Sequence, residues 1–449
     1  MSRTRSVTAM TIVTLCALVA VSCTDAKLQE SAGSTTTTTV VGTGGGPVTS
    51  GDSPLRGMRG ATPGIEVTDD FRQRIAAIDP TVGDFAAAAE GYDSVTVIAI
   101  AAEAARSDAP GRIASGIVGV TGVGHTCISF ARCRSLVLHN DDADYDGVSG
   151  SIEMQANGDP GQAGFAIVGY DGTGALRTDD HVTVQAKPLD GRPVEADPIF
   201  GPPGDGVLTI GTLLPVSGPA GASAAGALAG VQLAVRDIND HGGVLGDPMV
   251  LIPDESGDGS STATTDAVQR LLGQQVDAIV GGTTYAVTSV ALAPVTDAGV
   301  ILFSPTDTAR ALSIAPDHGL FFRVAPPTDL EGQVLGNLVT DDGYTKVAII
   351  SGPDDDDIEL ASDIAGSLNA ASASVTTTVT VKAGADLGAA AQQALDSAPQ
   401  AIVLATPVDV AAGLIKALVI KGKGPATLPT YGTAGNMGPE LAAAVGGGN

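Results

Sequence analysis

Residues 207–258 contain the pattern that most constrains how this chain can fold. An apolar run over 207–214 is bounded by proline-containing turns, which predicts a buried parallel strand. Apolar residues then recur at helical spacing from Ala227 to Ile238, and a His-Gly-Gly run ends that helix. A second strand follows over 248–253. This β-α-β unit predicts an open α/β sheet that places a ligand at the loop after its first strand.

The remainder of the chain alternates regularly between apolar strands and amphipathic helices. Predicted strands cover 277–280, 300–303, 320–324, 347–350, 375–381, 401–405 and 428–431, and predicted helices cover 262–272, 287–298, 330–339, 358–370, 387–395 and 408–420. Such alternation predicts parallel sheets with helices on both faces. The spacing indicates two consecutive sheets, with a break near 321–324.

Composition excludes several classes of function. A chain of 449 residues is long enough for two lobes, and 43% hydrophobic against 16% charged residues is typical of a globular protein. The formal charge of −27 argues against binding a phosphate backbone, which needs a basic surface. The sequence has no G-x-S-x-G, no G-x-x-x-x-G-K and no His-bearing metal motif, so we expect neither an enzyme nor a cofactor.

The first 22 residues are predicted to be an export signal, with two arginines before a short apolar run. The Ala-Val-Ser-Cys sequence ending at Cys23 resembles a bacterial lipobox, which makes Cys23 the lipidated residue. An ordinary secretory signal cleaved nearby is the alternative. Residues 23–53 are rich in Thr and Gly and are predicted to form a flexible tether.

The structured region begins near residue 54. A short strand and turn are expected over 55–64, and helices over 71–78 and 85–106. Cys127 and Cys133 are six residues apart, which in an exported protein favours a local disulfide.

Residues 142–153 match the calcium-loop pattern D-x-D-x-D-G-x5-E, but their context does not fit. A helix should follow Glu153, yet Asn157 and the Gly-Asp-Pro-Gly after it break the chain within one turn. We expect an acidic loop leading into a strand over 150–154, and no metal site.

The β-α-β unit carries a family resemblance. Its IGTLLPVSGPAG, AVRDINDHGGVLGDP and DESGD segments resemble the opening of a type I periplasmic solute-binding protein, of the leucine/isoleucine/valine-binding branch of ABC-importer lipoproteins. Motifs similar to that family's C-terminal end come earlier in this chain: GYD at 91–93, a C-x5-C hairpin at 127–133, YDG-x-SG at 145–150 and NGDP at 157–160. The motifs of the family's C-terminal end therefore precede those of its N-terminal end in this chain.

This order implies a circular permutation of the family's α/β fold, which has two doubly wound parallel-sheet lobes. In that interpretation 54–177 is the family's C-terminal segment and contributes to both lobes, and 178–206 is a linker with one strand at 181–186. Lobe 1 then covers 207–320, and lobe 2 with the return crossover covers 321–449. The alternative is a relic of one binding protein fused to a truncated second copy.

The resemblance also implies where a ligand would bind. The implied ligand-binding residues lie in loops after strands and at helix starts: Ser217, Ser223, Thr284, Tyr285, Thr306, Asp307, Thr308, Asp356 and Thr433. Each hydroxyl also has an ordinary structural explanation, as a helix cap or a turn residue, that requires no ligand. Ala434 stands where the family carries an acid that pairs with an α-ammonium. Because an unpaired buried charge is costly, an amino acid ligand would require Asp307 or Asp356 to substitute.

The function implied is that of a lipid-anchored, monomeric substrate-binding protein at the outer face of the cytoplasmic membrane. It would deliver a small polar solute, such as an amino acid, an amide or a related carboxylate, to an ABC transporter permease. A ligand-sensing receptor domain on the same fold, or a degenerate homologue that binds nothing, are the alternatives.

Overall fold

The computed structural model describes residues 52–186, 195–215, 221–257 and 262–446. Their strands form sheets of seven, five and three strands. The predicted signal segment, Cys23, nearly all of the predicted tether and Ser217 lie outside these ranges, so those predictions are not addressed by the structure.

The five-stranded sheet is built from the β-α-β unit that the sequence predicts. All its strands are parallel, in the order β11 (Phe321–Arg323), β10 (Ile301–Ser304), β9 (Ala278–Gly281), β7 (Thr209–Leu214) and β8 (Val250–Glu255). Helices α6 (Thr262–Gly273) and α7 (Tyr285–Asp297) share one core with the sheet, and α2 (Phe85–Ala105) and α5 (Gly221–Asp240) share the other. The sheet is therefore covered on both faces.

The seven-stranded sheet follows the same plan with an antiparallel extension. Its order is β13 (Ser374–Thr380), β12 (Lys346–Ser351), β14 (Ala401–Ala405), β15 (Thr430–Gly432), β1 (Arg59–Pro63), β5 (Gln162–Tyr170) and β6 (Leu176–Gln185), antiparallel only at β1–β5 and β5–β6. One face carries α8 (Thr328–Asp341) and α9 (Asp355–Ala370), and the other carries α10 (Leu387–Asp396), α11 (Val408–Ile420) and α12 (Pro439–Val445). The predicted pair of doubly wound sheets is confirmed.

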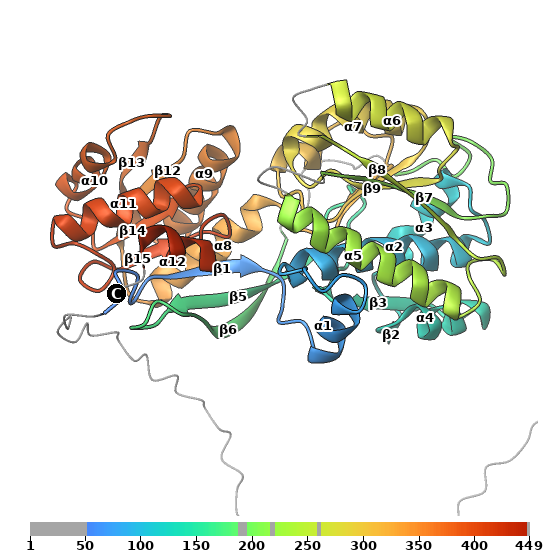
Figure 1. Cartoon of the computed structure of the whole chain (residues 1–449), viewed down its shortest axis with the longest axis horizontal. Helices are drawn as coiled ribbons and strands as arrows, with labels where there is room; N and C mark the ends of the chain where they lie inside the picture. The colour runs from blue at the N-terminus through green and yellow to red at the C-terminus, as the bar shows by residue number, and fades with distance from the viewer. Residues whose placement is uncertain (1–51, 187–194, 216–220, 258–261, 447–449) are drawn as a thin grey trace, which may run out of the picture. The chain divides into compact units, whose positions relative to one another are not determined.

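The N-terminal segment contributes strands to the seven-stranded sheet and helix α2 to the core beneath the five-stranded sheet. Strand β1 lies between β15 and β5, pairing parallel with the first and antiparallel with the second, and Figure 1 shows the blue β1 beside the green β5. Helix α2 packs closely on α5, where Gly91 faces the backbone of Ala227. Tyr92 and Val231 belong to one hydrophobic core. The early helix α2 and the later helix α5 therefore share one core.

Helix α2 is the one described helix long and apolar enough to cross a membrane. Most of it is buried within the fold, however, and its residues form the centre of a core. Asp84 caps its start by accepting a hydrogen bond from Ala87 N at 3.1 Å. Within the described residues, α2 is therefore a core helix of an α/β protein.

The cysteine region differs from the predicted hairpin. Cys127 ends the short strand β2 (His125–Cys127), whereas Cys133 lies in the helix α4 (Phe130–Leu138), which Ser129 caps. The hairpin prediction was wrong because Ser129 starts a helix between the two cysteines. The predicted disulfide between Cys127 and Cys133 is confirmed, with a Cα–Cα distance of 5.4 Å. Helix α3 (Pro110–Val120) was not predicted.

Hydrogen bonds to Asp93 of α2 fix the acidic loop that contains residues 142–153. Strand β3 (Ala143–Gly147) pairs antiparallel with β4 (Gly150–Ser151), so the predicted strand over 150–154 is shorter than expected. The buried carboxylate of Asp93 accepts hydrogen bonds from Tyr145 Oη at 2.6 Å and Ser149 N at 2.7 Å. In the part of the chain that the structure describes, no group of three or more His, Cys, Asp or Glu side chains could hold a metal ion.

The predicted linker over 178–206 begins inside the sheet. The strand expected at 181–186 is the second half of β6, which pairs with β5 along most of its length. Farther along, Phe200 stacks on His318 with ring centroids 4.8 Å apart. The polar composition of 178–185 reflects an exposed edge strand, because a sheet edge has one unpaired side.

Candidate functional site

The carboxyl ends of β9 and β10 place two of the predicted ligand loops next to each other. Ser304 Oγ donates to the carbonyl of Gly282 at 2.5 Å, and Thr306 Oγ1 donates to the carbonyl of Thr283 at 3.3 Å. In a parallel sheet, the loops after neighbouring strands gather at one edge. The structure therefore brings Thr283, Thr284 and Thr306 together at the carboxyl edge of the five-stranded sheet.

Asp307 is buried at this edge. Its backbone N–H donates to Ser304 Oγ at 3.1 Å, and its Oδ1 accepts from Ala309 N at 3.0 Å. Burial raises the pKa of Asp307, while hydrogen bonds from Thr288 and Ala309 and the charge of Arg323 partly offset that shift. The neighbouring Thr308 is half-buried, and its carbonyl accepts from Thr328 N at 3.0 Å.

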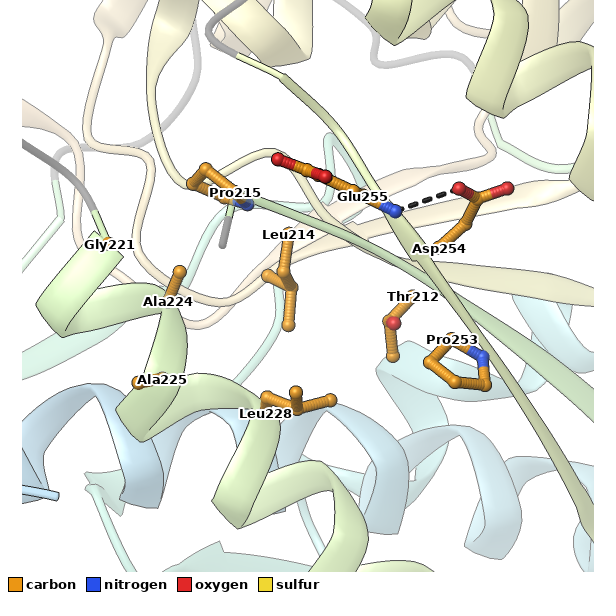
Figure 2. Close-up of a pocket in the computed structure, with 10 residues that line it drawn as sticks. All are labelled: Thr212, Leu214, Pro215, Gly221, Ala224, Ala225, Leu228, Pro253, Asp254 and Glu255. Carbon is orange, nitrogen blue, oxygen red and sulfur yellow. Dashed lines mark hydrogen bonds between the residues drawn. The ribbon is translucent and has the colours of Figure 1, made fainter. Parts of the chain in front are cut away.

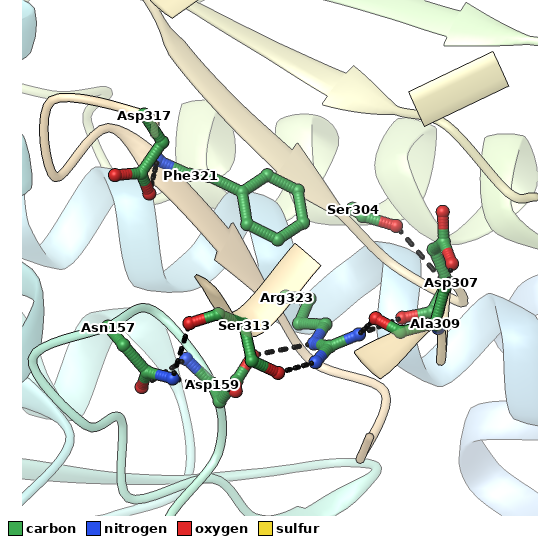
Figure 3. A network of polar contacts seen from close by, with 9 residues as sticks. All are labelled: Asn157, Asp159, Ser304, Asp307, Ala309, Ser313, Asp317, Phe321 and Arg323. Carbon is green, nitrogen blue, oxygen red and sulfur yellow. Dashed lines mark hydrogen bonds and ion pairs between the residues drawn. The ribbon is translucent and has the colours of Figure 1, made fainter. Parts of the chain in front are cut away.

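Arg323 holds the backbone of this loop in place (Figure 3). The buried guanidinium donates to Ala309 O at 2.7 Å and to Asp307 O at 3.2 Å. It also pairs with Asp159 at 2.7 Å and donates to Ser313 Oγ at 2.7 Å, in the turn η1 (Arg310–Ile314). Because Asp159 comes just before β5, the pair links the N-terminal segment to the loop that carries Thr306 and Thr308.

Three predicted residues of this sheet, Ser223, Thr284 and Tyr285, lie at the starts of helices α5 and α7. Ser223 Oγ donates to Asp84 Oδ2 at 2.6 Å, so it connects the start of α5 to the residue that caps α2. Thr284 is the N-cap of α7 without a side-chain cap bond, and Tyr285 is the first residue of that helix, 38% exposed. In the structure, the hydroxyl of Ser223 therefore joins helix α5 to helix α2.

The seven-stranded sheet brings its own polar residues to its carboxyl edge. Asp356 and Asp357 lie in the first turn of α9, directly after β12, and Asp356 is exposed. Burial, followed by the charges of Asp354 and Asp356, raises the pKa of Asp357 to about 6. Thr433 follows β15, is buried, and accepts a hydrogen bond from Asn436 Nδ2 at 3.2 Å.

The two carboxyl edges come within electrostatic range of each other. The charge of Asp356 contributes to the raised pKa of Asp307, which lies on the other sheet. Nearby, Arg310 of η1 pairs with Asp363 of α9 at 3.0 Å. Polar groups from two separate sheets therefore face a common region.

Sequence reasoning missed Glu331, which lies on α8 and is 5% exposed. Its Oε1 accepts from Ala434 N at 2.7 Å, and burial raises its pKa to about 7. Ala434 is the position where the family resemblance led us to expect an acid, and the structure supplies a carboxylate there from a different element. The signal in the sequence was an acid flanked by buried residues on an otherwise apolar helix face.

A cavity of about 370 Å³ lies at the ends of β7 and β8, beside α5 (Figure 2). It is lined by small and apolar side chains with two acids at its margin, namely Thr212, Leu214, Pro215, Gly221, Ala224, Ala225, Leu228, Pro253, Asp254 and Glu255. Asp254 is already paired with Arg270 at 2.7 Å. None of the described residues predicted to bind ligand lines this cavity.

Comparisons with known proteins identify the family to which this fold belongs. The model of the periplasmic binding protein family matches residues 207–449. This chain belongs to that family, and its two sheets have the type I fold.

Among the relatives, the Leu/Ile/Val-binding protein BraC3 of Rhizobium johnstonii is 34% identical over 119 residues, which is 25% of this chain and 31% of that protein. The chain thus aligns with about a third of that relative's length. A putative branched-chain amino acid ABC transporter structure from Silicibacter pomeroyi is 23% identical, with a TM-score of 0.47 over 54% of this chain and 64% of that one. LivJ from Streptococcus pneumoniae, in complex with isoleucine, is 25% identical, with a TM-score of 0.43 over 53% and 67% of the two chains.

Proposed function

We propose that this protein is an extracytoplasmic solute-binding protein that captures a small polar solute and delivers it to the permease of an ABC importer. The observation that carries this proposal is the meeting of two carboxyl edges, each lined with polar side chains, in a member of the periplasmic binding protein family. Carboxyl edges of parallel sheets are where open α/β folds bind ligands.

The proposed site consists of the loops after β9 and β10 on one side and of the loops after β12 and β15 on the other. In this proposal, Thr284, Thr306 and Thr308 supply hydroxyl and backbone groups from one sheet, and Asp356 and Thr433 supply polar groups from the other. A solute bound by both sheets stabilises the state in which they are close together, and that state is the one a permease would recognise. Leu/Ile/Val-type ligands are the first to test, in view of the relative's name.

A thermal-shift screen tests the proposal. The purified protein is heated with amino acids, amides, urea and short carboxylates, and a ligand raises the midpoint by mass action. We expect at least one solute of these classes to raise it in proportion to the logarithm of its concentration. A screen in which no solute shifts the midpoint would count against solute capture and favour a homologue that binds nothing.

We also infer that the chain is a circular permutation of the family's usual order. Strand β1 fits between β15 and β5 without duplicating any strand of the sheet, which supports one complete fold over a fusion of two copies. A rearranged chain that starts at residue 207 and places 52–186 after 446 should fold with the same circular-dichroism spectrum and the same solute response. Loss of folding in the rearranged chain would oppose this inference.

The proposed anchor is a lipid on Cys23, which follows the predicted export signal. Replacing Cys23 by Ser should release the protein from the membrane fraction of cells that export it, and should abolish labelling by a radioactive fatty acid. Membrane association that survives the substitution would exclude lipidation at this residue.

A further inference from the structure

Five buried side-chain oxygen atoms in the described part of the chain have no hydrogen-bond partner. They belong to Thr283, Asp307, Asp357, Thr406 and Asn436. Buried polar groups in folded proteins are almost always hydrogen-bonded, so each exception requires an explanation. Their positions in the fold suggest one explanation for all five.

Each of these residues follows the carboxyl end of a strand. Thr283 follows β9 and Asp307 follows β10 in the five-stranded sheet, whereas the other three follow β12, β14 and β15 in the seven-stranded sheet. Four of the residues are at most 8% exposed, and Asp357, although half-buried as a residue, has a buried Oδ2. The unpartnered atoms therefore occur on both edges of the proposed site, and among the described residues they occur nowhere else.

The chemistry of these atoms is mostly that of acceptors. Asp307 Oδ2 and Asp357 Oδ2 are carboxylate oxygens, and Asn436 Oδ1 is an amide oxygen whose own nitrogen already donates to Leu404 O and Thr406 O. The two threonine hydroxyls can accept or donate. A group that satisfies such a set must carry several N–H or O–H donors.

The charges around the two carboxylates favour a cation. Asp307 is faced by Thr288, by Asp356 and by Arg323, whose guanidinium already contacts Asp159, Ser313 and two carbonyls. Figure 3 shows the Asp307 carboxylate turned away from that guanidinium. Asp357 is faced by Asp354 and Asp356, accepts a backbone hydrogen bond from Asp354, and has its Oδ2 beside Gly352. Within the described residues, no free positive charge balances either group.

We propose that the site takes an organic cation whose charged group carries several N–H donors, such as a primary ammonium or a guanidinium, and that a carboxylate is not required. This proposal rests on the proposed solute-binding function and narrows its substrate class. Charge-assisted hydrogen bonds from the cation to Asp307 and Asp357 satisfy one unpartnered oxygen on each sheet.

Cation binding at these carboxylates should depend on pH. Burial raises the pKa of both carboxyls, that of Asp357 to about 6, and a cation prefers their ionised forms. Binding therefore displaces protons at low pH, so the affinity should rise as pH increases from 5 to 7.5. A ligand held only by hydroxyls and backbone groups would have no such dependence.

Four probes of related shape test the inference by calorimetry at pH 7.5. They are leucine, which has both charges, isopentylamine, which has only the ammonium, 4-methylpentanoate, which has only the carboxylate, and agmatine, which has a guanidinium and an ammonium at opposite ends. We expect isopentylamine or agmatine to bind and 4-methylpentanoate not to bind. Binding of the carboxylate without binding of either amine would overturn the inference and leave solute capture intact. If none of the four probes binds, the cation inference is also overturned. The broader solute screen then decides on its own whether solute capture stands.

The Asp357→Asn variant tests whether the cation binds at the Asp357 carboxylate. Asp355→Asn is its control in the same helical turn, because Asp355 is exposed. The first should weaken cation binding roughly tenfold or more at pH 7.5 and flatten the dependence on pH. The control should change neither. Equal losses in the two variants would mean that only the general negative charge matters, and would overturn the assigned role of Asp357.

Discussion

Glu331 is a buried carboxyl group whose ionisation the fold disfavours. Its pKa is raised from 4.5 to about 7 by burial, although it keeps one hydrogen bond, from Ala434 N. Below pH 4.5 the group is protonated in both the folded and the unfolded chain, so it carries no penalty. Between pH 4.5 and 7 the unfolded chain loses the proton first, and the free energy of unfolding falls as pH rises.

We therefore expect Glu331→Gln to stabilise the protein at pH 8 and to leave its stability nearly unchanged near pH 4.5. The glutamine keeps an acceptor for Ala434 and removes the ionisation, so the gain at pH 8 is at most about 3 kcal/mol. Urea unfolding at the two pH values measures it, and Glu66→Gln, at an exposed position, serves as the control. The same change at both pH values would mean that packing and not ionisation is responsible.

Arg323 and Asp159 form a pair that is buried on both sides, with side-chain exposures of 0% and 4%. Arg323→Met should cost about 3–5 kcal/mol of unfolding free energy, because it leaves the Asp159 carboxylate buried without its partner. Adding Asp159→Asn should recover part of that loss. A double-mutant cycle in urea gives the coupling, and strictly additive effects would show that the two side chains act independently.

The sequence indicated some of these residues and not others, for a physical reason. Thr306 and Thr308 were predicted because the family resemblance implies ligand-binding residues in this loop, which follows an apolar strand. Thr406 and Asn436 were not predicted, because a threonine or asparagine in a loop is usually a turn or cap residue. Their unpartnered oxygens depend on tertiary packing, which leaves no trace in the local sequence.

At the scale of elements, α2 and α5 pack against each other with their backbones in close approach. A Cβ at Gly230 would overlap the carbonyl oxygen of Ala88, and one at Gly91 would overlap that of Ala227. These glycines allow the two backbones to approach each other, and they come from parts of the chain that are far apart in sequence.

Gly230→Ala should accordingly destabilise the protein by about 1–3 kcal/mol, because the two helices must separate. Gly119→Ala is the matched control, since Gly119 is helical, exposed and has open space around its Cα. There the alanine should raise stability by up to about 1 kcal/mol through helix propensity. Chemical unfolding of both variants measures the contrast, and a gain at Gly230 would contradict the packing described.

Element types were predictable after residue 207, where strands and helices alternate with clear periodicity. Apart from the short helix α12, which was not predicted, the main errors fall in the N-terminal segment. The C-x5-C segment was predicted as a hairpin, whereas Ser129 caps a helix within it. Helix α3 was missed because its Gly-rich sequence, PGRIASGIVGV, has weak helix propensity and depends on burial of Ile113 and Ile117.

At the scale of the whole molecule, residues 52–186 and the described residues from 195 on share a sheet and a core, so we expect them to unfold as one unit. Strand β1 is hydrogen-bonded to β15, and α2 shares its hydrophobic core with α5. If a protease site is introduced within 187–194 and cut, the two pieces should stay together in size-exclusion chromatography and unfold in a single thermal transition. Separation of the pieces without denaturant would contradict the shared cores.

The position of β1 also has a consequence for biosynthesis. The ribosome produces β1 near the beginning of the chain and its neighbour β15 near the end, about 370 residues later, so the central pairing of the seven-stranded sheet cannot form until synthesis is nearly complete. Until then β1 has an unpaired side that could bind another nascent chain. The earliest strand of this protein therefore needs protection from aggregation for almost the entire time of its translation.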